Sequence, residues 1–153
     1  MIYIEAVNRP KALSGVNSLF LAGGITGCPD WQEDVCRKLD DTHWIVLNPR
    51  RKNFPIEDKG AAKEQITWEH DMLRLASARL FWFPCETLCP IVLFELGAWS
   101  MRSGPLFVGV HPDYARRQDV EIQLSLARPD VKIVYDLEEL VMQVRTWAPE
   151  LCY

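Results

Sequence analysis

The sequence predicts an α/β fold in which one domain is built on a parallel sheet. Short apolar runs rich in β-branched and aromatic residues alternate with longer segments of helical periodicity. Glycine, proline and asparagine mark many of the boundaries between these segments, and no repeat or linker interrupts them. Strands that alternate with helices form βαβ units. We therefore expect residues 1–153 to form a single doubly wound domain, of the Rossmann or flavodoxin-like kind, with five parallel strands and helices on both faces.

Each element follows from its local pattern. The five strands are expected over residues 18–22, 44–47, 80–83, 106–110 and 131–134. Residues 1–17 are expected to contribute an edge strand and a loop. Helices are expected over residues 61–78 and 119–127, after the N-caps Asp30 (to about Leu39) and Asp136 (to about Trp147), and from Pro90 onward. Proline suits the first helical position because the amide hydrogen that it lacks would have no partner there.

Composition excludes several classes of function. A net charge of −4 and a pI near 5.4 give no positive field for nucleic acid, so we expect no nucleic-acid partner. No apolar run reaches the ~20 residues that cross a bilayer, and residues 1–5 lack the pattern of a signal peptide. Three scattered histidines predict neither a metal nor a cofactor. The cysteines form an odd set without CxxC spacing, which predicts a reduced, cytoplasmic protein; they are Cys28, Cys36, Cys85, Cys89 and Cys152.

Ligands of open parallel sheets bind at the carboxyl ends of the strands. This rule selects the loops at residues 23–27, 48–53, 84–90 and 111–119 as the walls of a pocket. Gly23 and Gly24 match no phosphate-binding motif, but glycine lets a ligand approach the backbone closely. Asn48 and Arg50 are candidates for holding an anion, although loop arginines are often simply solvated. Trp31 is the best candidate for stacking on a nucleobase.

Glu95 is the strongest single sign of chemistry. Its helix is apolar on every side, so we expect the helix to be buried. A lone carboxylate there is costly unless it is paired, hydrogen-bonded or facing a cavity. The alternatives are a structural glutamate that binds backbone groups or an arginine, and a catalytic carboxylate.

A second acid lies on the helix predicted over residues 61–78. Glu69 falls at helical spacing on an apolar stripe that we expect to face the core, formed by Ala62, Ile66, Leu73 and Ala76. Asp71 lies roughly 200° around the helix from Glu69. The stripe therefore selects Glu69 over Asp71 as the inward acid, the alternative being that both lie at a solvated helix end.

An ordered set of motifs runs along the chain: residues 18–26 (SLFLAGGIT), 48–51 (NPRR), 65–69 (QITWE), 81–84 (FWFP) and 93–97 (LFELG). With these motifs, the chain from Ser18 to Leu137 resembles the nucleoside 2-deoxyribosyltransferases. The resemblance implies that Glu95, in the Glu-Leu-Gly element, is the nucleophile. It also implies that Glu69 helps to hold the nucleobase, with free nucleobases and nucleosides as the partners.

The resemblance further implies a homo-oligomer with shared active sites. In the family, a neighbour's loop after the fourth strand holds the sugar 5′-hydroxyl, and Asp119 falls at the matching position. As a carboxylate, Asp119 would disfavour a 5′-phosphate on the substrate. The positive charges of Arg116 and Arg117 would favour one.

The chain departs from better-known members at two positions. Phe20 stands where they carry a tyrosine, and Cys89 stands where they carry an aspartate before the nucleophile helix. Glu86, in the same loop as Cys89, is a candidate replacement acid. Asp71 remains a candidate substrate contact beside Glu69.

The implied reaction is transfer of a (2′-deoxy)ribosyl group between nucleobases through a covalent intermediate on Glu95. Two alternatives stay open. One is an N-glycoside hydrolase that acts on a nucleoside or nucleotide. The other is a module that binds nucleosides without catalysis.

Overall fold

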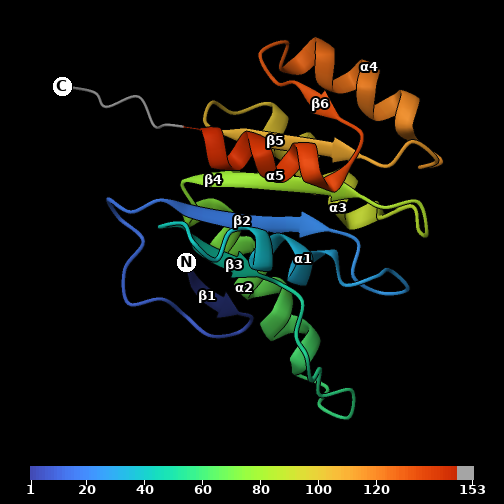
Figure 1. The fold of residues 1–153 in the computed structure, drawn as a ribbon. Helices are drawn as coiled ribbons and strands as arrows, with labels where there is room; N and C mark the ends of the chain where they lie inside the picture. Colours follow the sequence, from blue (N-terminus) through green and yellow to red (C-terminus); the bar gives the residue numbers. More distant parts are fainter. Residues whose placement is uncertain (148–153) are drawn as a thin grey trace.

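The computed structural model describes residues 1–147; Cys152 lies outside them. These residues form one sheet of strands and the helices that pack on it (Figure 1). The strands are β1 (Ile2–Glu5), β2 (Ser18–Gly23), β3 (Ile45–Asn48), β4 (Ala78–Phe83), β5 (Leu106–Val110) and β6 (Ile133–Val134). The helices are α1 (Trp31–Lys38), α2 (Ala61–Leu75), α3 (Pro90–Ser100), α4 (Arg117–Ala127) and α5 (Leu137–Thr146).

All neighbouring strands of the sheet run parallel, in the order β1-β3-β2-β4-β5-β6. The five predicted strands correspond to β2 to β6, and their order is that of the flavodoxin-like fold. The expected α/β architecture is therefore confirmed, but the sheet has six strands instead of five. The sixth is β1, which extends the sheet because Ile2 to Glu5 pair along β3.

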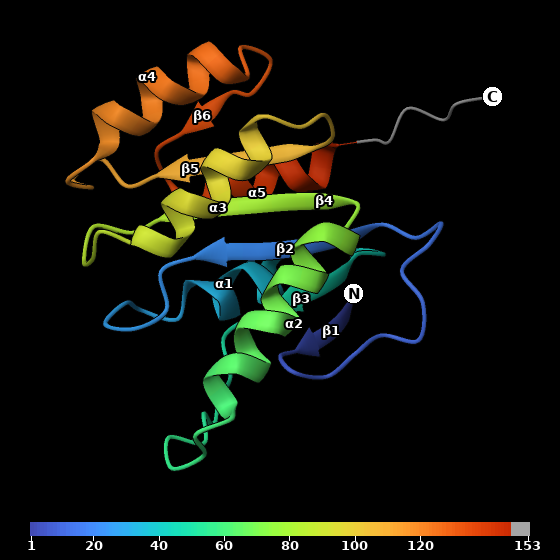
Figure 2. The ribbon, with the colours of Figure 1, turned by 180° about the vertical axis from the view of Figure 1, so that it is seen from behind.

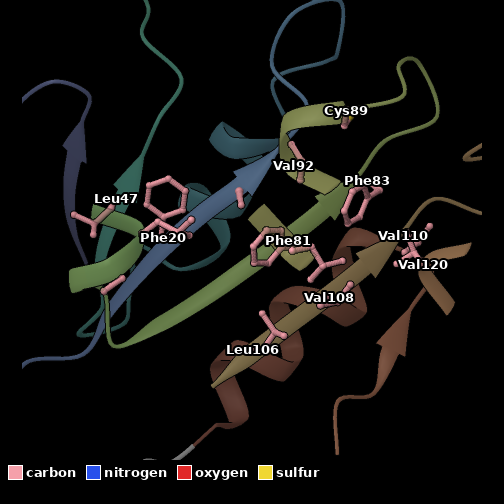
Figure 3. Close-up of a cluster of buried hydrophobic side chains, with 14 of the residues drawn as sticks. Phe20, Leu47, Phe81, Phe83, Cys89, Val92, Leu106, Val108, Val110 and Val120 are labelled. Atoms are coloured by element: carbon pink, nitrogen blue, oxygen red, sulfur yellow. The ribbon is translucent and has the colours of Figure 1, made fainter. Parts of the chain in front are cut away.

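The helices divide between the two faces of the sheet. Buried side chains of α2, α3 and α4 share one core cluster with the strands, while those of α1 and α5 share the other. Figure 2 shows α2 and α3 lying over the same face. Figure 3 shows part of the core beneath them, with Cys89 and Val92 at the start of α3 beside the ends of β2 and β4. This arrangement places the first turn of α3 where ligands of such sheets bind.

Three of the predicted helix starts are confirmed. Asp30 and Asp136 each accept a hydrogen bond from a backbone N–H in the first turn of their helices, and Pro90 opens α3. The helix expected over residues 119–127 begins earlier, at Arg117, so Asp119 lies inside its first turn.

The helix expected over residues 61–78 is shorter than predicted, because α2 ends at Leu75. Two interactions explain the early end. Ser77 exchanges hydrogen bonds with Ser18 at the start of β2, which draws the chain into the sheet. The guanidinium of Arg79 donates to the carbonyl oxygens of Leu73 and Arg74, which satisfies acceptors that the helix leaves open. As a result β4 begins at Ala78, two residues before its predicted start.

None of the helices within residues 1–147 is both long enough and apolar enough to cross a membrane.

Candidate active site

A cavity of about 710 Å³ lies between α2 and α3, at the point where the strand order reverses between β2 and β4. Both acids selected from the sequence line it, and so does the glycine loop that follows β2. The remaining lining comes mainly from the facing sides of the two helices. Of the predicted site residues, the cavity brings together Gly23, Gly24, Glu69, Cys89 and Glu95.

Glu95 lies in the second turn of α3, half-buried, with its side chain on the cavity wall. Val92 and Leu96, on either side of it, are buried against the sheet and hold the helix in this rotation. Burial raises the pKa of Glu95 to about 7, and the nearby charge of Glu69 acts in the same direction. Glu95 therefore exchanges its proton close to neutral pH, as suits a group that takes part in catalysis.

The expectation that the whole of this helix is buried is wrong. Ile91 and Phe94 are 64% and 76% exposed, although both are large apolar residues. Hydrophobicity all round a helix does not distinguish burial in the core from burial against another molecule. Only one side of α3 packs on the sheet within a single chain.

Glu69 faces Glu95 across the cavity from α2. Its Oε1 accepts a hydrogen bond of 2.8 Å from Nε2 of Gln65, which also donates to the carbonyl oxygen of Pro49 at 2.6 Å. Two acceptors therefore determine which way the Gln65 amide points. Burial raises the pKa of Glu69, and the hydrogen bond from Gln65 partly opposes this effect. Each acid is thus more readily protonated than an ordinary glutamate.

The apolar stripe that selected Glu69 is only partly correct, because Leu73 and Ala76 are buried in the core and the other two members are not. Ala62 and Ile66 are exposed, and the core contacts come from Ala61, Trp68, Met72 and Leu73. Ile66 lines the cavity instead. The prediction favoured Ile66 because it is apolar, but cavity walls and core positions have similar composition.

Asp71 does not line the cavity. It forms a 2.7 Å ion pair with Arg9, which holds the pKa of Asp71 below its usual value together with the neighbouring His70. One residue earlier in the chain, the backbone oxygen of Asn8 accepts a hydrogen bond from Nε1 of Trp68. Residues 8 and 9, which we call the N-terminal strap, therefore contact α2 on both sides of Glu69, at Trp68 and at Asp71.

The glycine loop is closely packed against its own chain. A Cβ added to Gly24 would lie 2.7 Å from Sγ of Cys28 and 2.9 Å from Sγ of Cys89, so this position has no room for a side chain. The carbonyl oxygen of Gly24 accepts a hydrogen bond from Nε1 of Trp31, whose ring is buried in the core on the α1 side. Trp31 is therefore not available to stack on a base in this cavity, contrary to expectation. Cys89 adopts a left-handed backbone conformation (φ 47°) at the turn into α3.

The other predicted site residues lie outside the cavity. Asn48 and Arg50 line a separate hollow of about 650 Å³, where Arg50 donates to the carbonyl oxygens of Cys28 and Pro29. Phe20 is buried against Trp68, with ring centres 6.1 Å apart. Glu86 is exposed in the loop after β4. Asp119 is exposed and forms a 3.1 Å ion pair with Arg116.

Sequence reasoning missed several cavity residues. Trp99 follows Glu95 at i+4 on α3, and Arg102 follows it at i+7, just past the end of that helix; His70 and Arg74 follow Glu69 at i+1 and i+5 on α2. Helical spacing from Glu95 could have found the first two, because residues at these intervals share a face. The residues on α2 follow Ile66 at helical spacing, and they were missed because Ile66 was assigned to the core and not to the cavity.

Two carboxyl groups with raised pKa values that line one cavity can divide two roles. One can act as a nucleophile while the other delivers or receives a proton. Within residues 1–147, no cluster of three or more histidine, cysteine, aspartate or glutamate side chains is arranged to hold a metal ion.

A family model described as "nucleoside 2-deoxyribosyltransferase like" matches residues 16–114, which run from just before β2 to the loop after β5 and include both acids. A search of curated proteins found no match.

Proposed function

The chain belongs to the nucleoside 2-deoxyribosyltransferase-like family, and on that premise we propose that it exchanges the nucleobase of a (2′-deoxy)ribonucleoside through a covalent glycosyl-enzyme on Glu95. The observation that carries this proposal is the presence of Glu69 and Glu95 on facing helices of one cavity. The family alone supports a transferase of this general type. The two acids supply the nucleophile and the proton donor that transfer of a glycosyl group needs.

In the first step, the carboxylate of Glu95 attacks the anomeric carbon of the sugar. The bond from that carbon to the base nitrogen breaks, and its electron pair leaves with the base. Glu69 delivers the proton that the departing base requires. In the second step, a nitrogen of another base attacks the same carbon, the ester to Glu95 breaks, and Glu69 takes up the proton. Two displacements retain the configuration of the sugar, and neither requires a metal ion or a redox cofactor.

The protonation of the two acids must be assigned in the complex with substrate. Both carboxylates have a raised pKa, and each charge disfavours the other, so near neutral pH we expect the pair to hold one proton. A nucleobase that accepts a hydrogen bond from Glu69 places that proton on Glu69. Glu95 is then ionised and can act as the nucleophile.

Transfer instead of hydrolysis requires that water be kept from the glycosyl-enzyme. In a single chain, the apolar residues Ile66, Ile91 and Phe94 at the cavity are exposed. We propose that a second copy of the chain covers them in a homo-oligomer, and that the neighbour's Asp119 reaches the sugar 5′ position. Asp119 does not line the cavity of its own chain, which is consistent with a role in a neighbouring one.

The function is tested by incubating the protein with a 2′-deoxynucleoside and a different free base, followed by separation of the products. We expect the new nucleoside to form, and mass spectrometry to detect a deoxyribosyl group on the peptide that contains Glu95. Free sugar and free base without exchange would identify a hydrolase. Binding without either product would identify a non-catalytic module.

The shared site is tested by mixing inactive Glu95→Ala and Asp119→Ala subunits under conditions in which subunits exchange. Partial recovery of activity is expected, because some pockets then combine an intact Glu95 with a neighbour's intact Asp119. An active monomer, or no recovery despite proven exchange, would contradict the shared site.

A further inference from the structure

We propose that the end of the cavity beyond Glu95 binds a phosphate group through Arg74 and Arg102, so that the preferred substrate is a nucleoside 5′-monophosphate. This inference rests on the proposed function, because it concerns a substrate whose sugar is held at Glu95. It adds a binding site that the two acids do not provide.

The first observation is the distribution of charge along the cavity. Arg102 follows Glu95 by seven residues and lies two residues past the end of α3, and Arg74 follows Glu69 by five residues on α2. All four side chains line the cavity. α2 and α3 both return from the carboxyl edge of the sheet toward its other edge (Figure 2). The cavity therefore has acids in its middle and cations at one end.

The second observation concerns ion pairs. Eight of the eleven arginines have a carboxylate oxygen within 3.8 Å; they are Arg9, Arg37, Arg50, Arg51, Arg116, Arg117, Arg128 and Arg145. Within residues 1–147, the three arginines that lack such a partner are Arg74, Arg79 and Arg102. The unpaired arginines are thus confined to the region of the cavity end.

Two of these arginines stack on Trp99, and the third, Arg74, lines the same cavity as that residue. The guanidinium carbons of Arg79 and Arg102 lie 3.9 Å and 4.8 Å from the centre of its ring. Arg79 is buried and donates to the backbone oxygens of Leu73 and Arg74, so its charge meets no carboxylate. Burial lowers the pKa of Arg79 to about 10, and the charge of Arg102 contributes to this shift. Within residues 1–147, no carboxylate forms an ion pair with this cluster.

The geometry favours a ligand that extends from Glu95. Arg102 lies just past the end of α3, and its guanidinium stacks on Trp99, which is one turn from Glu95 on that helix. A guanidinium binds phosphate oxygens with two parallel hydrogen bonds. Arg116 and Arg117 do not compete for this role, because they pair with Asp119 and Glu121. The pair with Arg116 also offsets the negative charge of a neighbour's Asp119 at the sugar 5′ position, so that carboxylate does not exclude a phosphate held by Arg74 and Arg102.

The test uses full-length Glu95→Gln protein, which cannot turn over, and calorimetric titration at low salt. The probes are a 2′-deoxynucleoside, its 5′-monophosphate and its 3′-monophosphate, for each of the four bases. We expect at least one 5′-monophosphate to bind about tenfold more tightly than both of its matched probes. Inorganic phosphate should compete only weakly, since it lacks the sugar and base.

The preference should disappear in Arg74→Gln and Arg102→Gln variants of that protein. It should persist in Arg37→Gln, which changes an exposed arginine on α1, on the opposite face of the sheet. Equal binding of nucleoside and 5′-monophosphate, or of the two phosphate isomers, would overturn the site. The site would also be overturned if the Arg74→Gln and Arg102→Gln variants kept the preference but altered the mass of the oligomer in sedimentation. In that case the arginines would contact another copy of the chain. None of these results requires catalysis, so they are distinguishable from a failure of base exchange.

Discussion

The two faces of the sheet are closed to different degrees. On one face, α1 and α5 are tied together: Arg145 pairs with Asp41 at 2.6 Å and donates to the backbone oxygen of Lys38, whose own ammonium pairs with Glu138. On the other face, α2 and α3 stand apart around a cavity of about 710 Å³. Both helix pairs belong to βαβ units, so the difference between them lies in what each pair encloses. The first pair encloses a packed core, and the second encloses a cavity. We therefore expect substitutions on the closed face to change stability, and those on the open face to change activity.

The largest effect is expected from Glu95→Gln. Loss of the nucleophile should lower kcat/KM for base exchange by about a thousandfold or more, an order of magnitude typical for groups that form the covalent bond. Stability should stay the same or rise, because the variant no longer buries a charge.

Glu138→Gln on α5 is the matched control. The same change in an exposed glutamate of the closed face should leave kcat/KM unaltered. Steady-state kinetics and urea unfolding measure both quantities, and wild-type turnover in Glu95→Gln would remove Glu95 as the nucleophile.

On the closed face, Leu140→Ala should reverse this pattern. Leu140 is fully buried in the core shared by α1 and α5, so its loss should lower the free energy of unfolding by about 2–4 kcal/mol. Activity per folded molecule should not change. Met142→Ala, on the exposed side of the same helix, should cost much less. A large fall in the activity of folded Leu140→Ala protein would show that the two faces are coupled.

The two neighbouring acids of α2 sharpen the comparison within the open face. Glu69→Ala should reduce exchange by about a hundredfold, the scale of general acid–base catalysis. Asp71→Ala should reduce it less than about threefold, because Asp71 lies outside the cavity and forms an exposed ion pair. The opposite ranking in kinetics would show that Asp71, not Glu69, serves the substrate.

The smallest effect is expected in the pH dependence of stability. Between pH 4.5 and about 7 the unfolded chain loses the proton of Glu95 while the folded chain keeps it, so stability falls as pH rises. Below this window both states are protonated, and above it both are ionised. The advantage of Glu95→Gln over the wild type should therefore grow across the window, by on the order of 1–3 kcal/mol. Urea unfolding at several pH values measures it, and an advantage that does not vary with pH would mean that the pKa of Glu95 is ordinary.

The sequence was sufficient for the architecture because alternating strands and helices leave few topologies. It also identified Glu69 and Glu95, since a charged residue among apolar ones is conspicuous. The prediction from sequence failed where an apolar residue does not lie in the core of its own chain. Ile66 and Phe94 are apolar but exposed within one chain, and a single sequence does not say whether an apolar position faces a core, a cavity or a partner.

Other site features depend on tertiary contacts that leave no local pattern. The loop position of Arg50 suggested an anion site, but its guanidinium is engaged by backbone carbonyls of residues 28 and 29. Arg79 and Arg102 meet at Trp99 from different elements of the chain. Neither arrangement follows from spacing along the sequence.

The N-terminal strap has an evolutionary consequence. Asn8 and Arg9 fix α2 on both sides of Glu69, yet they precede residues 16–114, which define membership of the family. Related proteins can thus match the family over both acids and the glycine loop while differing in the segment that contacts α2 beside Glu69. A change in such a strap would act on α2, and through it on Glu69, without replacing any residue that lines the cavity.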